Sequence, residues 1–316
     1  MSLGSKNKGS HEQGRLAERK PILWLRARTV QALRRFFIER GYLEVETPYL
    51  IPAPTPECHI EPIRAGHAFL HTSPELCMKR LLAAGYPSIF QICPCFRQDE
   101  RGERHLPQFT LLEWYRVGAD YFDLMEECEE MVLFVAHELG FGERLGYRGN
   151  PVSFQRPWQR ISVNEAFARY ASISMKDALE SGRFDLIMVE EIEPRLGTLQ
   201  PTFLYDYPSS LAALARLRPD NPQWAERFEL YVAGLELANA FSELTDVGEQ
   251  RKRFEREKER RLQSGKESYP LPERFLQALH FMPPSAGIAL GVDRLVMLFA
   301  DQATIDQVVS FTPEEL

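Results

Sequence analysis

Two blocks of alternating residues joined by a charged loop constrain the fold of this chain most strongly. Residues 88–96 and 109–116 have the pattern of two neighbouring β-strands. In the second strand Phe109, Glu113 and Tyr115 fall on one face, because side chains alternate along a strand. We therefore predict a β-hairpin that holds a carboxylate beside a phenol.

A second pair of strands is predicted farther along the chain. Residues 228–232 and 235–241 are joined through two small residues, and Asn239, Phe241 and Glu243 share one face by the same alternation. Strands and helices do not alternate regularly, so a doubly wound parallel sheet is not expected. The pattern predicts an α+β fold, in which a mostly antiparallel sheet is flanked by helices.

Apolar residues at helical spacing predict the helices, and the residues at their ends support them. Pro74 follows Ser73 at the start of one helix, and Glu249 is placed for a capping box at the start of another. The charge run of that second helix predicts a solvent-exposed face. The expected helices cover residues 23–40, 74–82, 120–139, 163–170, 175–181 and 251–263, and a small-residue strand enters a last helix within residues 287–298.

The pattern also predicts how the chain is divided. Residues 1–20 are polar and lack periodicity, so we expect a mobile N-terminal tail. Residues 21–316 are expected to form one domain. Within it the pattern weakens over residues 140–197, which predicts a peripheral segment.

Composition narrows the class of protein. Hydrophobic residues make up 44% of the chain and charged residues 26%, which is ordinary for a globular protein. No apolar run approaches the roughly 20 residues that span a bilayer, and no signal peptide is recognised, so we expect a cytoplasmic protein without a membrane partner. The net charge of −7 lowers the expectation of a nucleic-acid partner, because surfaces that bind phosphate backbones are usually basic.

The five cysteines are an odd number without framework spacing, which predicts reduced thiols rather than disulfides. Cys93 and Cys95 flank a proline and could form half of a metal site. No second pair and no histidine at matching spacing accompany them, so zinc is not expected.

The loop of the hairpin carries the first functional signal. Arg97 opens it, and a guanidinium fork suits a phosphate, whereas the strand carboxylate of Glu113 suits a cation. Together they describe a pocket for a nucleotide and an amino compound. Taken alone, the segment could equally be a solvated charged hairpin.

Three blocks then stand in the order found in class II aminoacyl-tRNA synthetases, and the chain resembles that family from about residue 22 to 300. They are a helix and strand that end at Pro48, the arginine hairpin at residues 96–115, and the glycine-rich strand with its Asp-Arg helix at residues 287–298. Finer resemblance is to the lysyl subgroup, through residues 73–75, 105–115 and 234–244.

The resemblance implies ATP binding. Carried over by position, Arg97 would contact the ATP α-phosphate and the substrate carboxylate, and Arg294 would brace the triphosphate from the other side, which makes these two the expected catalytic residues. Asp99 and His105 would lie near the ATP, and Phe109 would stack on the adenine.

The same resemblance implies a metal ion and an amino-acid pocket. Glu229 and Glu236 would hold Mg²⁺ between the phosphates, in keeping with the preference of a hard cation for oxygen ligands. Taken without the resemblance, each of these glutamates could be an exposed residue of a strand. The residues expected at the lysine substrate, whose ammonium the acids would compensate, are Ser73, Glu75, Glu113, Tyr115, Asn239, Phe241, Glu243 and Ala289.

Departures from the lysyl pattern favour a particular branch of the family. A bacterial lysyl-tRNA synthetase carries an anticodon-binding barrel, whereas only about twenty tail-like residues precede the first family helix here. Ser73 and Ala289 stand where alanine and glycine are usual, at the expected place of the substrate amino group and chain. In both features the chain resembles the elongation factor P–lysine ligases. Those enzymes activate lysine or (R)-β-lysine and transfer it to a lysine side chain of translation elongation factor P. With that protein as partner, tRNA is not expected.

Two alternatives remain open at this point. The chain could be a lysyl-tRNA synthetase catalytic domain that charges tRNA(Lys), or a non-catalytic regulatory relative. Class II cores dimerise through the first helix and strand, so the resemblance also implies a homodimer with Phe36, Phe37 or Tyr42 at the interface.

Overall fold

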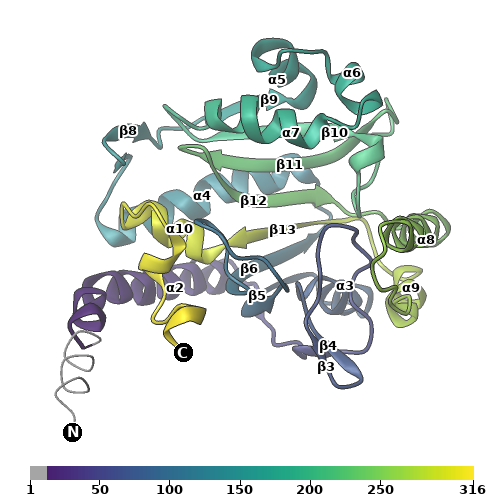
Figure 1. Ribbon diagram of the computed structural model, residues 1–316, viewed down its shortest axis with the longest axis horizontal. Coiled ribbons are helices and arrows are strands. Elements are labelled where there is room, and N and C mark those ends of the chain that lie inside the picture. The colour runs from purple at the N-terminus through teal and green to yellow at the C-terminus, as the bar shows by residue number, and fades with distance from the viewer. Residues whose placement is uncertain (1–12) are drawn as a thin grey trace, which may run out of the picture.

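One eight-stranded sheet organises the structure, in the order β1-β5-β6-β13-β12-β11-β10-β9 (Figure 1). The structure is a computed structural model and describes residues 13–316. All neighbouring pairs are antiparallel except β1–β5 and β9–β10. The predicted α+β class with a mostly antiparallel sheet is therefore confirmed. The strands of this sheet are β1 (Leu43–Glu44), β5 (Ser88–Phe96), β6 (Gln108–Val117), β9 (Gln159–Ser162), β10 (Thr202–Pro208), β11 (Trp224–Val232), β12 (Leu235–Ser242) and β13 (Ser285–Gly291).

Helices and small sheets surround this central sheet. The predicted helices are present with bounds close to the expected ranges, whereas α7, α9 and the small sheets were not predicted. The strand expected over residues 42–48 is shorter than predicted, because only Leu43–Glu44 pairs with β5. The helices are α2 (Lys20–Glu39), α3 (Glu75–Ala83), α4 (Tyr121–Leu139), α5 (Val163–Tyr170), α6 (Met175–Glu180), α7 (Phe184–Ile187), α8 (Val247–Gln263), α9 (Glu273–Leu279) and α10 (Val292–Phe299). The small sheets contain β2 (Leu50–Ile51), β3 (Arg64–Ala65), β4 (Ala68–Leu70), and separately β7 (Arg144–Tyr147) and β8 (Asn150–Ser153).

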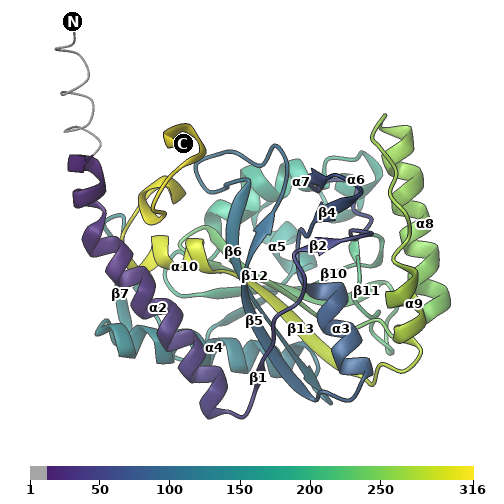
Figure 2. The ribbon, with the colours of Figure 1, turned by 90° about the horizontal axis from the view of Figure 1, so that it is seen from below.

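One face of the sheet packs on α2, α4 and α10 and forms the main hydrophobic core (Figure 2). Phe37 of α2 lies between Phe90 of β5 and Trp114 of β6, with ring centroids 5.0 Å apart in each pair. Each of these three side chains is fully buried. This continuous apolar layer fixes the sheet, so that the opposite face can carry polar groups.

That opposite face is bordered by α3, α8 and α9, which lie together on the other side of the sheet in Figure 2. They form a second cluster in which Leu76, Phe254 and Phe275 pack around Tyr115. The predicted solvent-exposed face of α8 is present, since Lys252, Glu255, Arg256, Glu259 and Arg260 are exposed, but one residue of the charge run departs from it. Arg261 is fully buried, and its guanidinium donates to the backbone carbonyls of Glu57 and Ile60 at 2.8 and 3.1 Å.

The segment at residues 140–197 is less peripheral than predicted. It has its own apolar cluster, built around the stacked rings of Phe167 and Phe184. Its strand β9 pairs with β10 and so extends the main sheet at one edge. The first part of the segment also contributes to the main core, through Leu145, Val152 and Trp158.

Two expectations for the N-terminal part need correction. Residues 1–12 lie outside the described part of the chain, but residues 13–18 are helical and Arg19 pairs with Glu315 at 2.7 Å, so the expected tail does not extend to residue 20. Phe36, Phe37 and Tyr42 are buried in the core of this chain and are not available to a second copy.

Among the described residues, no helix combines the length and apolar character needed to cross a membrane.

Candidate active site

Predicted site residues from four strands lie in one row across the polar face of the sheet. The pairing register places Glu113 of β6 opposite Ala289 of β13, Ala289 opposite Asn239 of β12, and Asn239 opposite Glu229 of β11. Residues that are directly opposite in neighbouring strands point to the same face. The register therefore joins three predicted lysine-site residues to a predicted metal ligand.

A second row runs beside the first, from Tyr115 through Gly287 and Phe241 to Arg227. Glycine is required in this row for lack of space, because a Cβ at Gly287 would overlap the ring of Tyr115 and crowd the Glu243 carboxylate. The missing side chain lets the phenol lie across β13. Tyr115 can then reach the Glu113 carboxylate in the neighbouring row.

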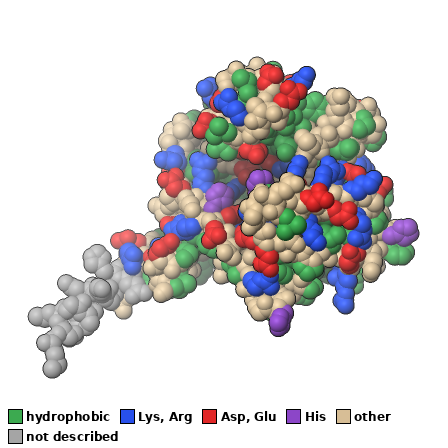
Figure 3. Space-filling view, turned by 45° about the vertical axis from the view of Figure 1, so that its right-hand side comes forward, with side chains coloured by type: hydrophobic (Ala, Val, Ile, Leu, Met, Phe, Trp, Pro, Cys, Tyr) green, Lys and Arg blue, Asp and Glu red, His purple; other side chains and the backbone are tan. Residues whose placement is uncertain are grey.

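A cavity of about 940 Å³ opens over these rows. Figure 3 shows the hollow, with acidic side chains inside it. Its volume is at the upper end of the range of small-molecule sites. The predicted site residues that line it are Ser73, Glu75, Arg97, His105, Phe109, Glu113, Tyr115, Glu229, Glu236, Asn239, Phe241, Ala289 and Arg294.

At one end of the cavity, Glu113 is held by two hydroxyl groups. Ser73 Oγ donates to Glu113 Oε1 at 2.6 Å, and the Tyr115 hydroxyl donates to Oε2 at 2.9 Å. Burial, together with the nearby carboxylate of Glu75, raises the pKa of Glu113 to about 8. A cationic ligand would favour the ionised form of this carboxyl group.

Behind this carboxyl lies a buried lysine that the sequence analysis did not assign. Lys79 Nζ contacts Glu75 Oε1 at 2.5 Å and also pairs with the Glu243 carboxylate. Burial lowers the pKa of Lys79, but the two carboxylates outweigh it and raise the pKa above its usual value. Burial raises the pKa of Glu243 to about 8 even though Lys79 opposes the change. Glu75 and Glu243 thus share one protein ammonium, and Glu113, which Lys79 does not contact, is left for a second cation.

The other end of the cavity presents arginines. The Arg97 guanidinium lies 4.9 Å from the centre of the Phe109 ring, and its buried Nε has no hydrogen-bond partner within residues 13–316. A buried donor without an acceptor is costly to leave unsatisfied. An incoming phosphate oxygen would satisfy it.

Arg294 reaches the same end from the first turn of α10. Its Nη1 donates to Glu236 Oε2 at 3.1 Å, and its Nη2 donates to His105 Nε2 at 2.6 Å. Burial and the Arg294 charge lower the pKa of His105, which keeps the imidazole neutral and able to accept this bond. The neighbouring Asp293 anchors the turn, because its Oδ2 accepts from the Thr110 backbone at 2.7 Å.

A cluster of three glutamates lies between the two ends of the cavity. Glu229 accepts from Arg227 Nη2 and from the Tyr231 hydroxyl, each at 2.7 Å. Burial raises the pKa of Glu229, with a further contribution from the carboxylate of Glu236. Burial and these same two acids raise the pKa of Glu193 to about 7. Carboxylates that repel one another in a cavity fit the needs of a hard divalent cation such as Mg²⁺.

Two predicted residues do not line the cavity. Asp99 instead borders an adjoining hollow of about 400 Å³ beside Glu61 and Lys266, which shares His59 and Glu100 with the cavity. Glu243 is buried and pairs with Lys79, which in turn contacts the cavity residue Glu75. Alternation along β12 placed Glu243 on the correct face, but it could not show how deeply the side chain is buried.

Several cavity residues escaped the sequence analysis. Arg227 donates to both Asn239 and Glu229, and its position opposite Phe241 could have been found from the strand register alone. Arg253 and Arg260 of α8 and Glu57 of the proline-rich loop also line the cavity. No signal in the sequence identified these three, because they come from segments that only tertiary packing brings to the sheet.

Comparison with known proteins agrees with this geometry. The model of the family described as tRNA synthetases class II (D, K and N) matches residues 7–315. The chain belongs to the class II aminoacyl-tRNA synthetase family. Within the class II family it is similar to proteins named elongation factor P–(R)-β-lysine ligase. The protein of that name from Pseudoalteromonas translucida (strain TAC 125) is 38% identical over 306 residues, covering 90% of this chain and 93% of that protein. The one from Klebsiella pneumoniae is 39% identical over 312 residues, covering 92% and 95%.

Proposed function

We propose that this protein is an ATP-dependent ligase that activates (R)-β-lysine, or lysine, and transfers it to a lysine side chain of translation elongation factor P. The observation that carries the proposal is the single cavity, which joins a carboxyl-rich end to an arginine-rich end across four strands. The names of the 38–39% identical relatives support the choice of amino acid and acceptor.

The proposed reaction has two steps. The carboxylate of the amino acid attacks the α-phosphorus of ATP, an aminoacyl adenylate forms, and pyrophosphate leaves. The ε-amine of the acceptor lysine then attacks the acyl carbon, an amide bond forms, and AMP leaves. Both steps build negative charge on phosphate oxygens, and Arg97 and Arg294 are the groups placed to stabilise it.

Each end of the cavity contributes through position and charge. Phe109 offers a ring face to the adenine, and Arg97 Nε offers a free buried donor to the α-phosphate. Glu229 and Glu236 would hold Mg²⁺, which supplies further charge compensation at the phosphates when bound. The protein itself needs no nucleophile, because substrate groups carry out both attacks.

At the carboxyl-rich end, Glu113 and Glu75 are the proposed partners of the amino groups of the substrate. Ala289 lies in the same row as Glu113, and Ser73 donates to that carboxylate. The Ala289 methyl takes up space that the glycine of a lysyl-tRNA synthetase would leave open. The Ser73 hydroxyl does the same at the position where alanine is usual. This reshaping of the pocket favours a substrate that carries its amino group on the β carbon instead of the α carbon.

Substrate affinity should increase as the pH rises towards 8. Below that pH Glu113 carries a proton, because burial raises its pKa to about 8, and a neutral carboxyl group pairs poorly with an ammonium. We expect the KM for the amino acid in ATP–pyrophosphate exchange to fall by up to about tenfold per pH unit over this range. The Glu113→Gln variant should bind the amino acid weakly and show a flatter profile. A KM that does not change with pH would contradict this role of Glu113.

The decisive experiment is mass spectrometry of elongation factor P after incubation with the protein and ATP. One arm contains (R)-β-lysine and another contains lysine. We expect the mass of the factor to increase by one lysyl residue, more rapidly with the β isomer. An unchanged mass in both arms would overturn the proposed function. Efficient charging of tRNA(Lys) in a parallel arm would instead establish the lysyl-tRNA synthetase alternative.

We also infer that the protein acts as a homodimer in the cytoplasm, where translation takes place. Although Phe36, Phe37 and Tyr42 are buried, an apolar surface remains on the outer side of α2 and β1. Trp24, Ile38 and Leu43 are 64%, 57% and 49% exposed. Sedimentation should give the mass of a dimer for the unmodified protein and that of a monomer for the Ile38→Glu variant.

A further inference from the structure

We infer that His71, Cys93 and Cys95 form a thiolate–imidazole site for a thiophilic metal ion of the Zn²⁺ or Cu⁺ class. The three side chains lie outside the ATP and lysine cavity, since none of them lines it. The sequence argument against zinc depended on the lack of a histidine at a suitable spacing. The tertiary structure supplies one from a different element.

The two thiols are brought together by the strand itself. Cys93 and Cys95 alternate with Pro94 along β5, so both thiols point to the same face, and their partners in β6 are Leu111 and Phe109. Both cysteines are buried, with exposed fractions of 2% and 0%. The strand thereby holds two sulfur atoms side by side, and no loop has to become ordered to bring them together.

His71 is held opposite this pair by the backbone. It directly follows β4, where its amide donates to the Tyr49 carbonyl at 2.8 Å and its carbonyl accepts from the Phe96 amide at 3.1 Å. The second bond ties the histidine to the end of the strand that carries both thiols. Only 1% of the residue is exposed.

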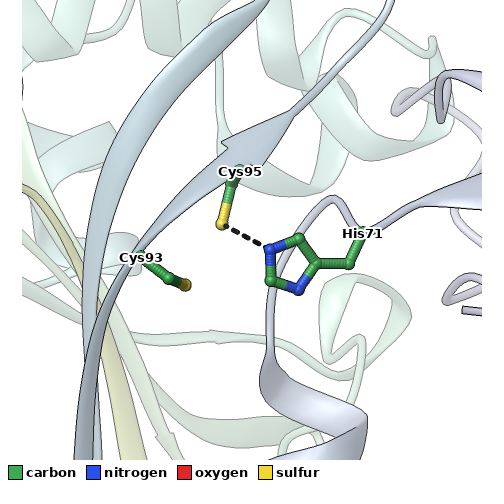
Figure 4. Close-up of side chains that lie close together, drawn as sticks. All are labelled: His71, Cys93 and Cys95. Carbon is green, nitrogen blue, oxygen red and sulfur yellow. Dashed lines mark hydrogen bonds between the residues drawn. The ribbon is translucent and has the colours of Figure 1, made fainter. Parts of the chain in front are cut away.

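The donor atoms are close to the geometry of a metal centre (Figure 4). One ligand atom from each residue lies within 4.8 Å of the other two, and His71 Nε2 is 3.9 Å from Cys95 Sγ. Bonds of about 2.3 Å to sulfur and about 2.0 Å to nitrogen place the donors around a tetrahedral Zn²⁺ ion roughly 3.5–3.8 Å apart. A small inward movement of the side chains would close the site. Two thiolates with one imidazole are ligands that suit zinc and copper.

The hydrogen bonding of His71 is incomplete as it stands. Nε2 is 2.8 Å from the Pro94 carbonyl, whereas the buried Nδ1 has no partner among the described residues. If an ion binds at Nε2, the ring proton moves to Nδ1 and the bond to Pro94 is given up. The rival interpretation is that the thiols are plain core, because Cys93 and Cys95 also contact Leu111 and Phe109 in a small apolar cluster.

An ion at this site would connect the substrate loop to the sheet. His71 lies two residues before Ser73, whose hydroxyl donates to Glu113, and Cys95 lies opposite Phe109. Metal occupancy would therefore stiffen the connection between β4 and α3. This consequence rests on the proposed function, but the binding of the ion itself does not.

The test is metal binding by the full-length protein after removal of metal with a chelator. In one arm Zn²⁺ is titrated against a chromophoric chelator, in a second arm Cu⁺ is titrated without oxygen, and in a third arm Co²⁺ reports thiolate ligation through its charge-transfer absorption. We expect one ion per chain and a thiolate–cobalt band. The two competition titrations show whether Zn²⁺ or Cu⁺ is preferred.

Variants identify the ligands. His71→Gln, Cys93→Ala and Cys95→Ala should each lower the affinity at least about tenfold, because even the loss of an outer partner commonly costs that much. Cys77→Ala is the matched control, since this thiol lies outside the cluster, and it should bind as the unmodified protein does. Circular dichroism checks that each variant folds. Absence of the cobalt band in the unmodified protein, or binding that survives all three ligand variants, would overturn the proposal in favour of plain core thiols.

Discussion

Replacing Arg294 with alanine should lower the rate of amino-acid-dependent ATP–pyrophosphate exchange by roughly 10²–10³-fold, as the loss of one preorganised donor to a transition state commonly does. The side chain enters the cavity between His105 and Glu236, at 2.6 and 3.1 Å. The measurement is the exchange rate at saturating ATP, so that weaker binding alone does not account for the loss.

The matched control is Arg101→Ala. Arg101 lies in the same charged loop as Arg97 but pairs outside the cavity, with Glu314 at 2.8 Å and Asp306 at 2.9 Å. Exposed ion pairs of this kind contribute little to the stability of the fold. Because Arg101 also pairs outside the cavity, the exchange rate of Arg101→Ala should be unchanged. Arg294→Lys should retain an intermediate rate, because it keeps the charge and loses the fork geometry. If Arg294→Ala and Arg101→Ala behaved alike, the assigned role of Arg294 would be wrong.

Replacing Lys79 with methionine should destabilise the fold by roughly 3–5 kcal/mol, because removing one partner of a buried ion pair leaves an uncompensated charge. The Lys79 side chain is 1% exposed and that of its partner Glu243 is fully buried, so water cannot replace the ammonium. The free energy of unfolding, measured by urea titration, gives the effect. Amino-acid binding should weaken as well, because Glu75 and Glu243 lose their fixed partner.

The pH dependence separates this explanation from a simple loss of packing. In the variant, Glu243 must bind a proton to stay buried, whereas in the unfolded chain it ionises near its ordinary pKa of about 4.3. The pKa of Glu243 is already raised to about 8 in the unmodified protein, so both folded proteins hold this proton below that pH. Above about pH 8 only the variant keeps it, so the destabilisation relative to the unmodified protein should grow as the pH rises beyond 8. Lys176→Met is the control, since Lys176 has the same four-residue spacing to Glu180 on an exposed helix and should change stability by only about 0.3–0.5 kcal/mol. A loss for Lys79→Met that is constant with pH would point to packing instead.

Local pattern was sufficient for the strands that carry the site. The hairpin of β5 and β6 and the pair of β11 and β12 follow from alternation, and alternation also places Glu113 with Tyr115 on one face of β6 and Asn239 with Phe241 on one face of β12. Because side chains alternate strictly along a strand, the face of each residue is a property of the sequence. Which strands lie next to one another is not such a property, and the insertion of β13 between β6 and β12 joins residues that are more than a hundred positions apart.

Local pattern misled where burial depends on distant partners. The charges of α8 looked like a solvated face, yet Arg261 is buried because backbone carbonyls from the loop before β3 surround it. Phe36 and Phe37 looked available for dimerisation, yet β5 and β6 cover Phe37. In each case the residue type was clear, but its neighbours come from another part of the chain.

By itself, the sequence of this protein determined its fold class, the faces of its strands and thirteen of the residues that line its cavity, because these depend on short-range alternation and on ordered motifs. Only the tertiary structure decided how deeply each group is buried and which groups meet. It paired Lys79 with Glu243, placed Asp99 outside the cavity, and brought His71 to Cys93 and Cys95. The physical reason is that desolvation and contact between charges or ligands depend on distances in space, which residue spacing along the chain does not specify.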